Sequence, residues 1–117
     1  MKCGFFNSVN GDRKYDADDI SNYFLKLISN GVFATPASSL QIQAAGGMKI
    51  KVTPGWAFVN CKWLRLDTDY YITLDKSDVQ YNRLDRIVVR LDPTESVRSV
   101  TIAVKKGTAS SPTKIVP

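Results

Sequence analysis

The chain has 117 residues, of which 44% are hydrophobic and 23% charged, and its net charge is +5. This length supports one domain with a single core and is too short for two. No apolar run approaches the roughly 20 residues that cross a bilayer. The sequence contains no histidine, which removes the commonest general base and zinc ligand and argues against an enzyme.

Residues 1–7 contain one lysine and no extended apolar core, so they do not resemble a secretory signal. We therefore expect synthesis in a cytoplasm, with Cys3 and Cys61 as two reduced thiols rather than a disulfide. The charges of residues 1–31 balance, so the basic excess lies in the rest of the chain. Such an excess allows an acidic protein or polymer as a partner.

An arm is expected over residues 1–15. Phe5 and Phe6 stand between a glycine and polar residues, and a turn is predicted at Asn10-Gly11 because both residues tolerate positive φ. A core would use at most one of two adjacent phenylalanines, so the arm is predicted to offer the other to a protein partner. Its candidate interface residues are Phe5, Phe6, Arg13 and Tyr15.

A helix is expected over residues 16–31, with Asp16 as the N-cap and Gly31 at the left-handed position that ends it. Its apolar stripe follows helical spacing and consists of Ile20, Tyr23, Phe24, Leu27 and Ile28. Full burial of this stripe would contribute about 10 kcal/mol of transfer free energy, at roughly 2 kcal/mol per side chain. The helix is therefore predicted to cover one face of a sheet.

The β-region is expected over residues 40–105. Alternation predicts strands at 40–44 and 48–52, and a three-residue turn at 45–47 that places Ile42 opposite Ile50. Further turns are predicted at Pro54-Gly55, Asn60-Cys61 and 67–69, and further strands at 70–74, 86–91 and 100–104. The predicted fold class is α+β and mostly β, with one helix packed on an antiparallel sheet or small sandwich of about six to eight strands.

The turns at Pro54-Gly55 and Asn60-Cys61 would gather three aromatic residues on one sheet face, namely Trp56, Phe58 and Trp63. Either the helix covers this group, or it is a subunit interface, since exposed tryptophan is a typical interface anchor. Lys49 and Lys51 would lie beside the same aromatics. This combination leaves open a small module that binds single-stranded nucleic acid or another polyanion, or a module that binds saccharides.

No motif for a cofactor is present. The acidic residues Asp16, Asp18 and Asp19 are explained by helix capping, and Asp67 with Asp69 lacks the rest of a calcium loop, so no metal site is expected. Residues 1–107 are thus predicted to form one globular domain. Residues 108–117 have linker composition and are expected to lead into a further C-terminal region.

Residues 4–19, which read GFFNSVNGDRKYDADD, resemble the start of N-terminal domains of tail and baseplate proteins from siphophages and prophages of Gram-positive bacteria. Similar pieces recur at residues 31–33, 46–48, 52–60, 84–92 and 106–108, so the resemblance covers most of the chain. Cys61 departs from it, because the similar turn often reads Asn-Gly, and this residue puts the tightness of that hairpin in question.

The resemblance implies an anchoring domain that fixes a receptor-binding or fibre protein to the phage tail tip, in the virion. It implies a structural role without catalysis, other tail or baseplate proteins as partners, and a homo-oligomer such as a dimer, trimer or hexamer. It supplies no catalytic residue.

Overall fold

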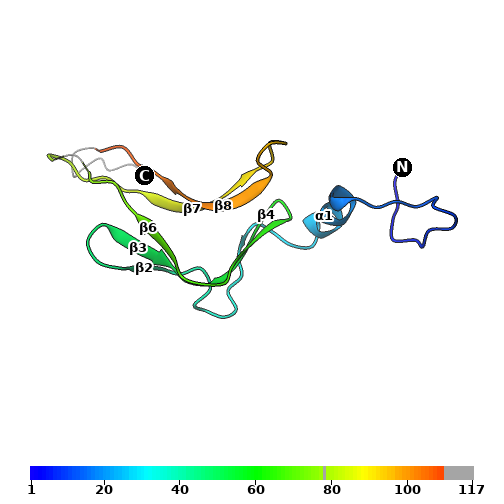
Figure 1. Cartoon of the computed structure of the whole chain (residues 1–117), viewed down its shortest axis with the longest axis horizontal. Coiled ribbons are helices and arrows are strands. Elements are labelled where there is room, and N and C mark those ends of the chain that lie inside the picture. The colour runs from blue at the N-terminus through cyan, green and yellow to red at the C-terminus, as the bar shows by residue number, and fades with distance from the viewer. Residues whose placement is uncertain (78, 110–117) are drawn as a thin grey trace.

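The computed structural model describes residues 1–77 and 79–109 (Figure 1). Within this part of the chain one helix is followed by eight strands in three antiparallel sheets, which confirms the predicted α+β, mostly β class. The elements are α1 (Ala17–Leu25), β1 (Gly31–Val32), β2 (Ile42–Ala44), β3 (Lys49–Val52), β4 (Gly55–Val59), β5 (Lys62–Leu66), β6 (Tyr70–Thr73), β7 (Arg86–Asp92) and β8 (Ser99–Lys105).

A long bent hairpin organises the lower layer of the molecule. Strands β3 and β4 follow each other along one side of this hairpin, and β5 and β6 follow each other along the other side. The register changes by one residue between the two halves, since Gly55 lies opposite Leu66 whereas Lys49 lies opposite Thr73. The bend separates two sheets, in which β1 flanks the half with β4 and β5, and β2 flanks the half with β3 and β6.

Two of the predicted turns are wrong, because the chain bends there without reversing. Pro54-Gly55 does not close a hairpin, and β3 does not pair with β4, because Pro54 has no N–H for the ladder and the chain changes sheet there. Ser39 lies so close to Gly55 that an added Cβ would overlap its hydroxyl group. Residues 67–69 also bend the chain without reversing it, since β5 and β6 belong to different sheets.

The β2–β3 hairpin has the predicted three-residue loop, displaced by one residue to 46–48. Ala45 and Lys49 close the loop, and Ile42 therefore lies opposite Val52 rather than Ile50. The apolar face survives because the displacement moves each pairing by two residues, which preserves the alternation of faces. Gly46 and Gly47 supply the positive φ angles that the loop requires.

The predicted turn at Asn60-Cys61 is confirmed, and it places Phe58 opposite Trp63. Both turn residues have positive φ, at 46° and 59°, so Cys61 does not prevent the tight hairpin that Asn-Gly favours. The β7–β8 hairpin lies above the bent hairpin and contacts β4 and β5 (Figure 1). Among the residues that the structure describes, the buried hydrophobic ones are Val52, Ala57 and Cys61.

The helix is shorter than predicted, because it ends at Leu25 instead of near residue 30. The N–H groups of Leu27 and Ile28 both donate to the carbonyl of Phe24, which closes the last turn. Asn30 then bonds the β4–β5 turn, where its side chain accepts from the Asn60 N–H at 2.8 Å, and Gly31 pairs with Phe58. Asn30 and Gly31, which were predicted to end the helix, therefore take part in contacts of the sheet formed by β1, β4 and β5.

The predicted cover of a sheet face by the helix is wrong. No residue of α1 is buried, and the helix lies beyond the β4–β5 turn with the N-terminal arm extending farther away (Figure 1). The radius of gyration is 19.5 Å, whereas a compact domain of this length has about 13 Å. Among the described residues, no helix is long and apolar enough to cross a membrane.

Candidate functional site

The arm folds back on the helix through a turn that its sequence specifies. Asn10 and Gly11 both have positive φ, and Val9 and Asp12 bond across them in both directions, with the Val9 N–H on the Asp12 carboxylate at 2.7 Å. This geometry matches a type I′ turn, for which Asn-Gly is the preferred pair. The turn brings residues 12–15 back alongside residues 4–7.

Tyr15 joins the two sides of the arm. The Phe6 N–H donates to the Tyr15 hydroxyl at 2.8 Å, and the hydroxyl donates to the Phe6 carbonyl at 3.2 Å. The Arg13 guanidinium lies over the Phe6 ring at 5.7 Å. The four arm residues predicted as an interface, Phe5, Phe6, Arg13 and Tyr15, are therefore brought together.

Aromatic and ionic contacts attach the arm to α1. Phe5 packs edge-on against Tyr23, with ring centroids 4.8 Å apart, and Lys2 pairs with Asp19. The Lys2 ammonium lowers the pKa of the Asp19 carboxyl, which also accepts the Asp16 N–H and completes a capping box. We call residues 1–25 the arm–helix unit.

The arm–helix unit is ordered by its own contacts but leaves its aromatic side chains exposed. Phe5 is 59% exposed and Phe6 57% exposed, and Tyr15, Tyr23 and Phe24 are exposed as well. A small unit that holds several aromatic rings and an arginine in fixed positions has the composition of a protein-interaction hot spot. The sequence pattern predicted that Tyr23 belongs to a buried stripe, and its contact with Phe5 was not predicted.

The second predicted interface lies on the outer face of the sheet formed by β1, β4 and β5. Trp56 and Trp63 contact each other with ring centroids 5.4 Å apart, and Phe58 packs edge-on against Phe33 at 5.2 Å. Arg65 lies over the Trp56 ring at 5.6 Å and also bonds Asp67. We call this set the tryptophan face, and it consists of Phe33, Trp56, Phe58, Trp63 and Arg65.

The tryptophan face is largely open to solvent, with Trp63 59% exposed and Phe58 half-buried, whereas Ala57 on the opposite face of β4 is only 1% exposed. The predicted grouping of Trp56, Phe58 and Trp63 is thus confirmed. Lys49 and Lys51, however, do not lie beside them. They belong to the other sheet, where Lys49 lies over the Tyr71 ring and Lys51 pairs with Asp69.

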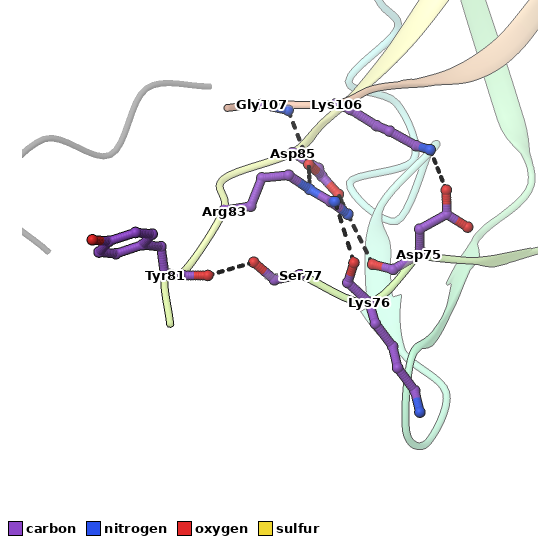
Figure 2. Close-up of polar contacts among 8 residues, drawn as sticks. All are labelled: Asp75, Lys76, Ser77, Tyr81, Arg83, Asp85, Lys106 and Gly107. Carbon is purple, nitrogen blue, oxygen red and sulfur yellow. Dashed lines mark hydrogen bonds and ion pairs between the residues drawn. The ribbon is translucent and has the colours of Figure 1, made fainter. Parts of the chain in front are cut away.

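A polar clasp lies at the far end of the molecule from the arm (Figures 1 and 2). Arg83 binds Asp85 with two bonds, at 2.7 and 3.0 Å, and donates to the carbonyl of Asp75. Asp85 also accepts the Gly107 N–H at 3.0 Å. The clasp therefore ties the connection between β6 and β7 to the end of β8.

The clasp is a structural device by its chemistry. Arg83, and next the Gly107 N–H, lower the pKa of Asp85, and Lys106 lowers the pKa of Asp75. Each cation thus stabilises the ionised form of its carboxylate, which makes the clasp a charge-assisted tie between segments. Among residues 1–77 and 79–109, no group of three or more cysteine, aspartate or glutamate side chains lies close enough together to hold a metal ion.

A cleft of about 670 Å³ separates α1 from the two hairpins. Its walls come from the start of the helix, the β4–β5 turn and the β7–β8 loop. Lys62 crosses it and reaches Ser21 at 3.2 Å and Asp18 at 3.6 Å. The polar side of α1 therefore contacts its own sheet, and the apolar stripe lies on the side of the helix away from Lys62.

Comparison with protein-family models, with curated proteins and with solved structures gives no match for this chain.

Proposed function

We propose that this chain is a structural protein of a phage tail tip or baseplate, in which it anchors a receptor-binding or fibre protein through protein–protein contacts. The observation that carries the proposal is the arm–helix unit, whose aromatic side chains are held in place and yet exposed. An ordered unit loses little conformational entropy when it binds, so its exposed area is available for affinity.

The separation of features along the molecule fits an anchor. The arm–helix unit lies at one end and the clasp that holds β8 lies at the other (Figure 1), and the longest dimension is 68 Å. An anchor has to keep its attachment point apart from whatever it carries, and an elongated chain does so. In this proposal the domain acts without catalysis and works in the virion, in contact with other tail proteins and with further copies of itself.

Removal of the arm's aromatic side chains tests the proposal. The phage or prophage that encodes the chain is made to carry Phe5→Ala with Phe6→Ala, and the chain is quantified in purified virions by immunoblotting. We expect at least a tenfold loss from virions, because hot-spot aromatic residues each contribute on the order of 1–2 kcal/mol or more. Immunogold labelling of wild-type virions should place the chain at the tail tip.

Tyr71→Ala provides the matched control, because Tyr71 is also an exposed aromatic residue, at 54%, but lies on β6 in the other sheet. This variant should enter virions at the wild-type level. Absence of the wild-type chain from virions would refute the anchoring function.

A polyanion-binding role is the rival proposal, and one observation favours it. Lys49, Lys51 and Tyr71 share one face of the sheet formed by β2, β3 and β6, which combines cations with an aromatic ring. Such a face would bind single-stranded oligonucleotide in a salt-dependent way. Retention on immobilised oligonucleotide at low salt, abolished by Lys49→Ala with Lys51→Ala, would support the rival.

A further inference from the structure

The apolar stripe that begins on α1 and runs past its end has little cover within its own chain, since only Phe5 of the arm packs on Tyr23 and only Ile28 is half-buried. Ile20, Tyr23, Phe24 and Leu27 are all exposed, and Leu27 is 65% exposed. The polar side of the same helix faces the sheet, where Lys62 contacts Asp18 and Ser21. An amphipathic helix normally turns its apolar side to the protein, so this helix is oriented for a surface outside its own chain.

The tryptophan face is the corresponding uncovered surface on the sheet. Its opposite side faces the β7–β8 hairpin and contains the buried Ala57. Helix α1 does not pack on the tryptophan face in the same chain, because Lys62, on the other side of β5 from Trp63, holds the start of the helix. Trp63 only lines the cleft beside the helix start, and Leu27 and Ile28, past the helix end, line an open hollow with Phe33 and Phe58. Each chain therefore carries one largely exposed apolar helix stripe and one largely exposed aromatic sheet face.

The amount of exposed surface indicates how large the missing contact is. The accessible surface is 9122 Å², about 40% above the value expected for a compact chain of this mass. The surplus is on the order of 2,500 Å², which matches the roughly 1,000–2,500 Å² that each subunit contributes to an obligate oligomer. Contact with a second copy would bury part of this surplus.

Charge favours the same pairing. Residues 1–31 contain four basic and four acidic residues and are neutral, whereas the rest of the chain carries the whole excess of +5. Contact between two sheet regions would bring like charges together. Helix α1 itself contains Asp18 and Asp19 and no basic residue, so contact between this helix and the sheet of another copy avoids that repulsion.

We propose that α1 of one copy packs its apolar stripe on the tryptophan face of a second copy. The contact is head-to-tail, because it joins two different surfaces, and its repetition gives a ring where the rotation between copies closes and a filament where it does not. The inference rests on the proposed anchoring function, for which it names a second copy as one partner of the arm–helix unit. The arm residues Phe5 and Phe6 remain for the tail partner.

Two variants of the full chain test this contact. Phe24→Lys places a charge in the helix stripe, and Trp63→Ser removes the largest exposed ring from the sheet face. Both side chains are exposed, so circular dichroism should show unchanged folding. Size-exclusion chromatography with light scattering should give an oligomer for the wild type and at least a tenfold weaker self-association for each variant.

An equal mixture of the two variants gives the sharpest result. The Trp63→Ser chain keeps an intact helix stripe and the Phe24→Lys chain keeps an intact tryptophan face, so one contact can form between them. We expect a 1:1 dimer in the mixture, where each variant alone is monomeric. Tyr71→Lys, on the other sheet, should self-associate like the wild type.

A wild-type chain that stays monomeric at millimolar concentration would overturn the proposal, and so would an oligomer that neither variant weakens. Weakening without recovery in the mixture would exclude the head-to-tail arrangement. If a variant misfolds, a second experiment tests the contact without disrupting it. A photo-crosslinking residue replaces Phe24 in otherwise wild-type chains, and isotope-labelled and unlabelled chains are mixed before irradiation. Cross-links to residues 56–65 should then join labelled to unlabelled peptides, and cross-links only within one chain would refute the contact.

The outcomes for the two proposals are separable. A chain that oligomerises through these surfaces but is absent from virions refutes only the anchoring function. A chain that is present in virions but monomeric in solution, with Phe24→Lys incorporated normally, refutes only the contact between copies.

Discussion

Arg65 and Arg83 each bind the aspartate two residues later, but the two pairs differ in exposure. The side chains of Arg83 and Asp85 are 14% and 12% exposed, whereas those of Arg65 and Asp67 are 51% and 66% exposed. A charge-assisted bond sheltered from water resists competition, and its loss leaves a partner without solvation. The same Arg-x-Asp pattern is therefore expected to stabilise the fold more at Arg83 than at Arg65.

Arg83→Met is expected to lower the free energy of unfolding by about 1–3 kcal/mol, because Asp85 would keep its charge without its main partner. Urea denaturation followed by circular dichroism measures the change. Arg65→Met removes a pair of equal length and spacing but should cost below about 1 kcal/mol, since the Arg65–Asp67 pair is exposed. Equal losses for the two variants would show that the clasp has no special role.

The clasp should also make the fold sensitive to acid. Arg83 and Gly107 lower the pKa of Asp85 in the folded chain, so the carboxylate stabilises the fold above its unfolded pKa of about 3.9. That contribution is lost as the pH falls through the lower folded pKa. Between pH 5 and pH 2 the stability of the wild type should fall more steeply than that of Asp85→Asn, which cannot titrate there. Parallel curves in urea titrations would contradict this.

At the scale of elements, α1 depends on its cap to an unusual degree. The helix has nine residues and no buried side chain, and isolated helices of this length are marginal in water. Asp16 and Asp19 form a reciprocal capping box, with bonds of 2.9 and 3.1 Å. The box and the aromatic contacts with the arm supply the order that packing normally provides.

Asp16→Ala should therefore loosen the helix selectively, by about 1 kcal/mol. Hydrogen exchange of the Asp19 and Ile20 amides should accelerate about fivefold, while amides of β7 and β8 keep their protection. Asn22→Ala is the control, because it changes an exposed helical side chain without a cap and should slightly slow exchange. Acceleration of exchange throughout the chain would contradict a local role.

At the scale of the molecule, the chain has too little core for its composition. A hydrophobic fraction of 44% accompanies only three buried hydrophobic residues among those described, and these are small or medium in size. Hydrophobic burial is the main favourable term in folding. Association that covers α1 and the tryptophan face would supply the burial that a single chain lacks.

The midpoint of thermal unfolding should consequently rise with protein concentration, by several degrees over a hundredfold range, because association stabilises the folded state by mass action. Differential scanning calorimetry at several concentrations measures this. Phe24→Lys should unfold at a lower temperature that does not depend on concentration. A concentration-independent midpoint for the wild type would contradict association as the source of stability.

Features that depend on neighbouring residues could be predicted from the sequence. The turns at Asn10-Gly11 and Asn60-Cys61, the cap at Asp16 and the alternation that separates Trp56 from Ala57 all follow from local backbone preference and side-chain period. The gathering of the arm residues Phe5, Phe6, Arg13 and Tyr15 follows from the first of these turns. The clasp was missed, although the repeated Arg-x-Asp spacing at Arg65 and Arg83 is visible in the sequence.

The sequence by itself thus determined the opening arm, the start of the helix, the fold class and the aromatic face. Only the tertiary structure decided where the helix ends, which strands pair around Pro54, and which way the apolar stripe points. Asn30 bonds Asn60, Ser39 lies against Gly55, and Lys62 holds Asp18. Each of these contacts joins residues at least 16 positions apart in the chain, so local preference carries no signal for it.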